Sequence, residues 1–245
     1  MLQKRLIELS KIAYQRDIVT YSDFLNLNEL NILHTTPKQE WFSSYETYGG
    51  YEFSERQMVA FLPDALYYDY EYPMQIIEIK PLNAKFSEEL SHRDYLGSLM
   101  NLGIERNKMG DILLMEDRAI LFIREEICSY IAENLTKIKH TIVQTNIMNI
   151  TDISYEPKFE LIKGNVASVR LDTVLTTAYP MSRSKMTAYI EAGKVFVNGK
   201  LVTSNGYHLK EHDIISVRGL GRIQYEEILG STKKGRYMVS VKKFI

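Results

Sequence analysis

The sequence has little that would support a metal centre, a disulfide framework or a membrane span. Its single cysteine, Cys128, cannot form an intramolecular disulfide, and no Cys/His cluster has zinc spacing. The cysteine lies in an apolar helical pattern, which predicts a buried structural thiol. Charged residues interrupt the apolar N-terminus, which excludes a signal peptide, and no apolar run is long enough to cross a membrane. We therefore expect a cytoplasmic protein with no membrane partner and no cofactor.

Net charge is also nearly absent, because 30 Lys and Arg stand against 31 Asp and Glu. The two signs are nevertheless separated along the chain. Residues 1–165 hold 17 cations against 25 acids, a balance of −8, whereas residues 166–245 hold 13 against 6, a balance of +7. Such asymmetry indicates a basic binding module joined to an acidic body. A nucleic acid is the usual partner of a basic domain of this size, and a solvated basic surface is the alternative.

Hydrophobic periodicity predicts three helices in the first 50 residues. The first covers residues 2–15, the second begins at Ser22-Asp23, and the third begins after Pro37. Further along, strand patterns occupy residues 56–62, 74–80, 111–115, 119–123 and 141–150, and helical patterns occupy residues 87–102 and 125–137. From Met74 the order is β-α-β-β-α-β, that of ferredoxin-like and RRM-like domains.

These patterns predict an α+β protein with four parts. They are an N-terminal helical segment (1–50), a ferredoxin/RRM-like α/β domain (51–153), a linker (154–165) and a small αL-type RNA-binding domain with a C-terminal β-hairpin (166–245). The RRM signature of aromatics on a central strand is missing. Phe122 is the one aromatic in its strand, and we expect it to pack in the core.

The stretch from Ser168 to Leu220 carries the main functional signal. Asp172 lies in the first turn of a short helix, where a carboxylate suits the helix dipole. Ser182 is a plausible cap for a second helix, and Arg183 and Lys185 fall in its first turn. Cations there oppose the dipole, whereas a bound phosphate would make them favourable. We therefore predict a phosphate contact, with two solvated charges as the alternative.

Basic residues continue beyond that helix. Asn198-Gly199 joins two alternating β runs and is a strong hairpin signal that exposes Lys200. His208 and Lys210 add polar groups before the final strand of the module. The stretch G-S-T-K-K-G-R then places Lys233, Lys234 and Arg236 at the tip of a second hairpin, for which a solvated loop is the alternative.

A second polar cluster lies in the acidic part. His92-Arg93-Asp94 brings an imidazole near a carboxylate, but no phosphate loop, nucleophile or metal cluster accompanies it. The triplet is consistent with a capped, exposed helix start, with an RNA or ribosome contact, or with catalysis. The possible secondary RNA or ribosome contacts are His92, Arg93, Arg106 and Lys108.

The basic stretch resembles the small RNA-binding domain first described in the fourth small-subunit ribosomal protein. The matching elements are R-L-D at 170–172, S-R at 182–183, the helix closed by Gly193, V-x-V-N-G-K at 195–200 and Asp213-x-Ile. The resemblance implies that Arg170, Ser182, Arg183, Lys185 and Lys200 face RNA phosphates. One departure is His212, where that family usually has glycine. Pseudouridine synthases carry a catalytic aspartate in a similar triplet within a different context, so we interpret Asp172 as structural.

The whole chain also resembles the YlmH family of Gram-positive bacteria. The shared layout is S-H-R-D-Y-L-G-S-L-M-N-L-G-I-E-R at 91–106 followed by G-D-I, then S-V-R-L-D, then T-K-K-G-R. This resemblance implies a ribosome-associated factor that binds the large subunit with a peptidyl-tRNA and assists the rescue of stalled nascent chains.

The sequence thus predicts a non-enzymatic, monomeric RNA-binding protein whose partners are large-subunit rRNA and peptidyl-tRNA. Two alternatives remain: an rRNA- or tRNA-modifying enzyme with its catalytic centre in residues 51–150, and a cell-division or translation-linked factor that binds other proteins. We predict no catalytic residue and no metal ligand. The predicted RNA-binding residues are Arg170, Ser182, Arg183, Lys185, Asn198, Lys200, His208, Lys210, Lys233, Lys234 and Arg236.

Overall fold

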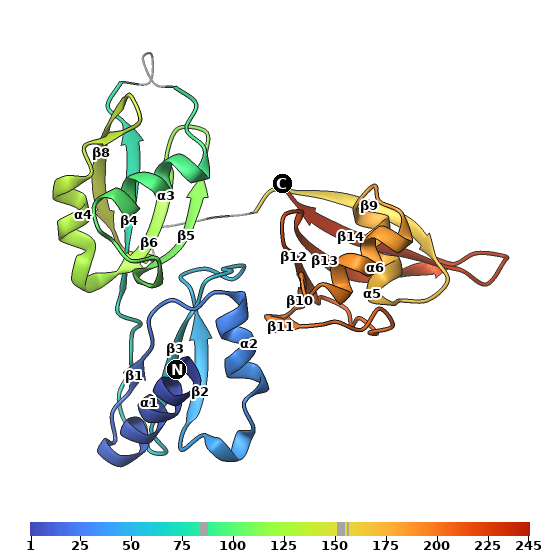
Figure 1. The fold of residues 1–245 in the computed structure, drawn as a ribbon, viewed down its shortest axis with the longest axis horizontal. Helices are drawn as coiled ribbons and strands as arrows, with labels where there is room; N and C mark the ends of the chain where they lie inside the picture. The colour runs from blue at the N-terminus through green and yellow to red at the C-terminus, as the bar shows by residue number, and fades with distance from the viewer. Residues whose placement is uncertain (84–87, 151–154, 156) are drawn as a thin grey trace. The chain divides into compact units, whose positions relative to one another are not determined.

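The computed structural model describes residues 1–83, 88–150, 155 and 157–245. The chain divides into two units, Met1–Tyr155 and Glu156–Ile245 (Figure 1). Among the described residues, no helix is both long and apolar enough to span a membrane. The predicted α+β class is confirmed, and its details follow unit by unit.

The chain starts with two helices packed on a small sheet. Helix α1 (Leu2–Arg16) and helix α2 (Leu27–Thr35) bury Leu6, Leu30 and Leu33 against strand β3 (Met58–Leu62). Strands β1 (Thr20–Tyr21) and β2 (Ser44–Tyr48) pair antiparallel with β3 on its two sides, which gives the order β1-β3-β2. The apolar face predicted for residues 2–15 is therefore the face that builds this core.

Two details of this region differ from the sequence prediction. The second helix begins at Leu27 rather than at Ser22-Asp23, because Asn26 accepts the N–H groups of Asn28 and Glu29 and forms a capping box with Glu29. After Pro37 there is only a 3₁₀ turn, Lys38–Glu40, instead of a third helix. Residues 44–48 then extend as β2, so the first 50 residues contain sheet as well as helix.

The region after Met74 has the predicted β-α-β-β-α-β order. Its elements are β4 (Met74–Pro81), α3 (His92–Asn101), β5 (Met109–Leu114), β6 (Ala119–Arg124), α4 (Cys128–Asn134) and β8 (Thr141–Met148), with a short strand β7 (Lys137–Ile138) at the edge. The antiparallel sheet order β5-β6-β4-β8-β7 is that of the split βαβ sandwich. Ser87, the predicted start of the first helix here, lies outside the described residues.

Helices cover one face of this sheet, and the N-terminal region covers part of the other. Helices α3 and α4 pack on one face through Tyr95, Leu99 and Ile131, and Cys128 is buried among them. Burial raises the pKa of the Cys128 thiol, as expected for a structural residue. On the other face, Phe122 is fully buried beside Phe24 of the N-terminal region, which confirms its predicted packing role. Part of the face that RRM domains use for RNA is therefore covered by the protein itself, whereas Gln144 and Asn146 of β8 stay exposed on it.

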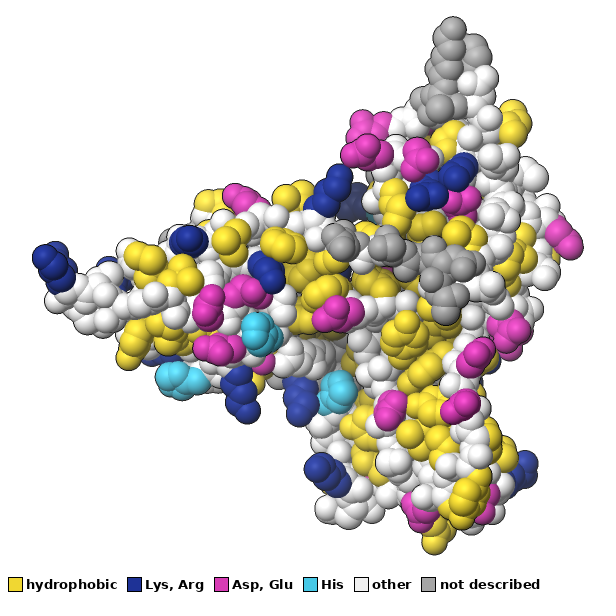
Figure 2. Space-filling model, turned by 180° about the vertical axis from the view of Figure 1, so that it is seen from behind, with side chains coloured by type: hydrophobic (Ala, Val, Ile, Leu, Met, Phe, Trp, Pro, Cys, Tyr) yellow, Lys and Arg dark blue, Asp and Glu magenta, His cyan; other side chains and the backbone are white. Residues whose placement is uncertain are grey.

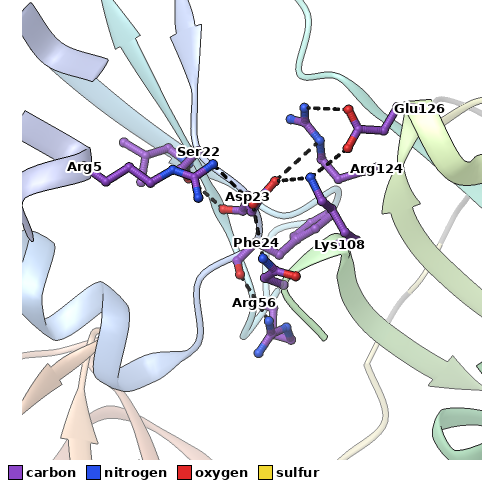
Figure 3. A network of polar contacts seen from close by, with 10 residues as sticks. Arg5, Ser22, Asp23, Phe24, Arg56, Lys108, Arg124 and Glu126 are labelled. Atoms are coloured by element: carbon purple, nitrogen blue, oxygen red, sulfur yellow. Dashed lines mark hydrogen bonds and ion pairs between the residues drawn. The ribbon is translucent and has the colours of Figure 1, made fainter. Parts of the chain in front are cut away.

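A polar junction centred on Asp23 ties the N-terminal region to this sheet (Figure 3). The Asp23 carboxylate pairs with Lys108 at 3.0 Å, with Arg5 at 3.6 Å and with Arg124 at 3.9 Å. Nearby, the buried Arg56 guanidinium donates to the carbonyl oxygens of Phe24 and Met109. The cations at this junction thus have their partners within the first unit.

The second unit is a six-stranded sheet with two helices. Its elements are β9 (Phe159–Val166), α5 (Leu171–Ala178), α6 (Arg183–Glu191), β10 (Val195–Val197), β11 (Lys200–Leu201), β12 (Ile214–Val217), β13 (Gly221–Ser231) and β14 (Tyr237–Phe244). The strand order is β11-β10-β12-β13-β14-β9. Apolar residues of α5 and α6, including Leu171, Leu175 and Met186, form one core with Val195, Val239 and Val241 of the strands.

Strand β9 corrects the predicted linker at 154–165. From Phe159 onward this segment pairs antiparallel with β14 along its whole length, from Phe159–Phe244 to Val166–Tyr237. Gly164 also touches helix α5, because a Cβ built there would lie 2.3 Å from Thr177 Cγ2. Residues 159–165 are thus part of the second unit. Of the predicted linker, residues 154 and 156 lie outside the described residues.

Candidate nucleic-acid interface

The predicted helix N-terminus at Ser182 is present, but one of its cations is paired. The Ser182 hydroxyl oxygen accepts the Lys185 N–H at 3.3 Å and so caps α6. Arg183 donates from Nε and Nη2 to a single oxygen of Asp172, at 2.9 and 2.7 Å. The alternative of two solvated charges therefore does not hold for Arg183.

Asp172 is the centre of this arrangement. Its side chain is 2% exposed and also accepts Arg170 Nε at 3.2 Å. A carboxylate in the first turn of α5 is favoured by the helix dipole, and two guanidinium groups offset the cost of burying it. The structural role predicted for Asp172 fits this geometry. Arg170 and Arg183 remain 35% and 59% exposed, so both can still present N–H groups to a ligand.

A second buried carboxylate, Asp213, organises the other side of the module. It is 6% exposed and accepts Asn198 Nδ2 and the Lys210 main-chain N–H, each at 2.8 Å. The Asn198 side-chain oxygen accepts the Ile214 N–H at 2.9 Å, so both ends of this amide are used inside the protein. Asn198 therefore has a structural role, and its predicted RNA contact stays a prediction.

The backbone around Asp213 explains two sequence signals. Asn198 and Gly199 have φ values of 48° and 76°, which is the geometry of the predicted two-residue hairpin. His212 has a φ of 68°, a left-handed conformation that glycine adopts more easily. Its N–H donates to the Tyr225 carbonyl at 2.7 Å, so the turn is kept although histidine stands at the usual glycine position.

One loop connects the two carboxylate centres. The main chain of His208 pairs with that of Arg170 beside Asp172, and Lys210 lies next to Asp213. Lys185, Lys200 and Lys210 are exposed, and their ammonium groups have no acidic partner among the residues that the structure describes. Two carboxylates thus hold the loop and turns of this module, and three ammonium groups without an acidic partner among the described residues are available to anions.

The tip of the β13–β14 hairpin carries the remaining predicted cations. Lys233, Lys234 and Arg236 are all exposed, and Figure 2 shows Lys or Arg side chains at this end of the second unit. Thr232 organises the turn, since its N–H donates to the Arg236 carbonyl at 2.7 Å and its hydroxyl oxygen accepts the Arg236 N–H at 3.1 Å. The hairpin tip that carries these three cations is therefore a hydrogen-bonded turn.

Sequence reasoning missed two cations that the fold brings together. Lys194 and Arg218 lie over the rings of Tyr189 and Phe196, at 4.8 and 5.4 Å from the ring centroids. The Arg218 N–H donates to the Lys194 carbonyl at 2.9 Å, which places the two residues side by side. The pairing of β10 with β12 brings these two residues together. In the sequence, each cation only adjoins a predicted strand, which does not show that they are neighbours.

The secondary sites predicted in the first unit separate into two kinds. Arg106 donates to the carbonyl oxygens of Met109 and Gly110, and burial lowers its pKa to about 10. Lys108 bridges Asp23 and Glu126. These internal partners argue against the predicted RNA or ribosome contact for both residues. His92 and Arg93 do lie exposed at the start of α3.

The H-R-D triplet is built as a helix cap. Asp94 accepts both the N–H and the hydroxyl of Ser91, and Lys139 lies 2.8 Å from the same carboxylate oxygen. The hydrogen bond from Lys139 is the main reason that the pKa of Asp94 falls to about 2. The carboxylate is thus committed to Ser91 and Lys139, which argues against an acid–base pair with His92. Among the described residues, no three His, Cys, Asp or Glu side chains form a group that could hold a metal ion.

Comparison with known proteins finds one matching family domain in each of the two units. Residues 68–152 match the putative RNA-binding domain in YlmH, and residues 169–215 match the S4 domain. The chain is 28% identical to the ribosome-associated protein quality control protein P2 of Bacillus subtilis, over 97% of this chain and 92% of that protein. The resemblance to the YlmH family is confirmed.

A solved structure gives the same assignment. The cell division protein ylmH from Streptococcus pneumoniae is 26% identical and superposes with a TM-score of 0.50, covering 62% of this chain and 91% of that one. The S4 domain contains both carboxylate centres and the three free ammonium groups. The YlmH-type domain contains the β5-β6-β4-β8-β7 sheet. This chain therefore carries two domains of RNA-binding families.

Proposed function

We propose that this protein is a non-enzymatic, monomeric factor that binds rRNA and tRNA on the large ribosomal subunit and acts in the quality control of stalled nascent chains. The observation that carries the RNA-binding part lies in the S4 domain. Asp172 is paired with Arg170 and Arg183, and Asp213 accepts hydrogen bonds from within the domain, while Lys185, Lys200 and Lys210 have no acidic partner among the described residues. The ribosomal setting is carried over from the Bacillus relative and its name. Such a factor works in the cytoplasm.

The chemistry of these lysines suits RNA phosphates. Three ammonium groups on rigid elements can each replace a condensed counterion, so binding gains from counterion release. The Lys185 N–H is already taken by the Ser182 cap, so the Lys185 side chain rather than its amide would reach a phosphate. Because phosphate contacts carry no sequence information, we expect these lysines to recognise structured RNA by its shape rather than its sequence.

Cosedimentation of the purified full-length chain with ribosomal subunits tests this function. We expect it to travel with large subunits that carry peptidyl-tRNA, and a combined Lys185→Ala and Lys200→Ala variant to lose most of this binding at about 0.15 M salt. Crosslinking should then place the S4 domain on rRNA and tRNA.

A matched control pairs Lys4→Ala with Lys137→Ala, two exposed lysines of the first unit. This variant should bind ribosomes like the original chain. Binding to the small subunit alone, or equal binding by the S4-domain variant, would contradict the proposal.

A further inference from the structure

The first unit contains a tyrosine-lined cleft that the RNA-binding function does not use. It has a volume of about 410 Å³ and lies where β2 of the small N-terminal sheet meets the start of β4 and the end of β8. Its lining residues are Tyr48, Tyr70, Glu71, Tyr72, Met74, Gln75, Asn149 and Ile150.

Aromatic rings form one wall of the cleft. Tyr72 stands at the centre, with the ring centroid of Tyr48 at 5.5 Å, that of Tyr21 at 5.7 Å and that of Tyr70 at 6.1 Å. These pairs meet at 52° to 61°, so the rings pack tilted against one another rather than stacked. Tyr48, Tyr70 and Tyr72 line the cleft, and the face of such a ring attracts organic cations.

Carboxylates reinforce this preference. Glu71 lines the cleft and is exposed, and Glu46 accepts the Tyr70 hydroxyl at 2.7 Å. Burial and this hydrogen bond raise the pKa of Tyr70 to about 12, and burial raises that of Tyr72, so both phenols stay neutral at physiological pH. The negative charge at the cleft therefore belongs to the carboxylates, while the rings offer neutral π faces.

The residues around the cleft carry little available positive charge. Strand pairing sets Arg124 opposite Met74, but Arg124 is 17% exposed and pairs with Asp23 and Glu126. Residues 39–79 contain eight Asp and Glu and a single cation, Arg56. That cation is 8% exposed and is bonded to main-chain carbonyls, so it does not reach a ligand in the cleft. Asp and Glu side chains are also spread over the first unit on the face seen in Figure 2. Phosphates would be repelled from such a surface, whereas cations would be drawn to it.

We propose that this cleft binds a lysine or arginine side chain of a basic protein segment. The rings supply cation–π contacts, Glu71 supplies a charged partner, and the acidic surface concentrates the basic segment nearby. The two units would then divide their partners by charge, with RNA on the S4 domain and a basic protein on the first unit.

Fluorescence anisotropy with a labelled hexa-arginine peptide tests the proposal on the full-length chain. At about 0.1 M salt we expect Tyr70→Leu and Glu71→Gln each to raise the Kd by about threefold to thirtyfold, the range that follows from loss of one cation–π or ion-pair contact. Tyr70→Phe keeps the ring and should bind nearly as well as the original chain. Tyr70 lies outside the buried core cluster beside it, so circular dichroism should show an unchanged fold.

Two controls make the result specific. Glu133→Gln removes an exposed carboxylate elsewhere in the first unit and should leave peptide affinity unchanged. Tyr70→Leu should also leave RNA binding by the S4 domain unchanged, which separates this site from the proposed function. Equal peptide affinity for Tyr70→Leu and the original chain would overturn the proposal, as would tighter binding of an unpaired RNA oligonucleotide at the cleft.

Discussion

Single residues decide which cations of the S4 domain remain available. Arg183 and Lys185 occupy the same helix turn, yet only Arg183 meets Asp172, and only Lys185 is left without an acidic partner among the described residues. The sequence shows that both are cations near a helix start. It does not show which one reaches a carboxylate eleven residues earlier, because that depends on how α5 packs against α6.

The Asp172 centre leads to a stability prediction. Asp172→Asn keeps the shape of the side chain but removes the charge that two guanidinium groups share, so we expect the second unit to lose about 1–3 kcal/mol of unfolding free energy. Scanning calorimetry measures this as an earlier transition. Glu211→Gln, an exposed site without such contacts, is the matched control. If the two variants melt together, the Asp172 contacts do not stabilise the fold.

The helix cap at α3 leads to a pH prediction. The pKa of Asp94 is lowered from its ordinary 3.8 to about 2, mainly by Lys139. Because the folded pKa is the lower one, this stabilisation is fully present above about pH 4 and is lost as the pH falls toward 2. Lys139→Ala should raise the pKa of Asp94 toward 3.8, as an NMR titration of the carboxyl carbon would record. An unchanged titration midpoint would mean that Ser91 alone sets the pKa.

At the scale of elements, the sequence predicted those whose pattern is local. The β-α-β-β-α-β order, the Asn198-Gly199 hairpin and helix α6 all follow from periodicity, turn residues or caps. Strands β2 and β9 were missed because their evidence lies in their partners. β2 is a short Ser, Tyr and Thr segment that pairs with β3, and β9 follows Pro157 and contains Gly164. A proline and a glycine are typical of a linker, and only the pairing with β14 shows that β9 is a strand.

The packing of β9 against α5 can be tested at one glycine. Gly164→Ala would place a methyl group 2.3 Å from Thr177 Cγ2, so we expect a loss of about 1–3 kcal/mol in the unfolding free energy of the second unit. Adding Thr177→Ala makes room and should recover part of that loss. Gly230→Ala on β13, where a Cβ meets nothing within 4 Å, is the control. Additive effects of the two changes would show that β9 and α5 do not touch at this point.

At the scale of the whole molecule, charge is separated between the two units, and our proposals give each unit a partner of opposite charge. In the acidic first unit, the buried Arg56 and the half-buried Arg106 are held by main-chain carbonyls and Lys108 by two carboxylates, whereas three lysines of the S4 domain have no acidic partner among the described residues. A near-neutral total charge therefore coexists with strong local fields. RNA affinity should then depend on salt through the second unit alone.

The salt dependence of RNA binding measures how many phosphates each unit contacts. For the full-length chain and a stem-loop RNA, the logarithm of the binding constant should fall linearly with the logarithm of salt concentration. Lys185→Ala combined with Lys200→Ala should reduce the slope by about two, one for each lost phosphate contact. The Lys4→Ala and Lys137→Ala pair removes the same charge from the first unit and should leave the slope unchanged. If that control pair lowers the slope equally, the first unit also holds phosphates, and the division of partners by charge fails.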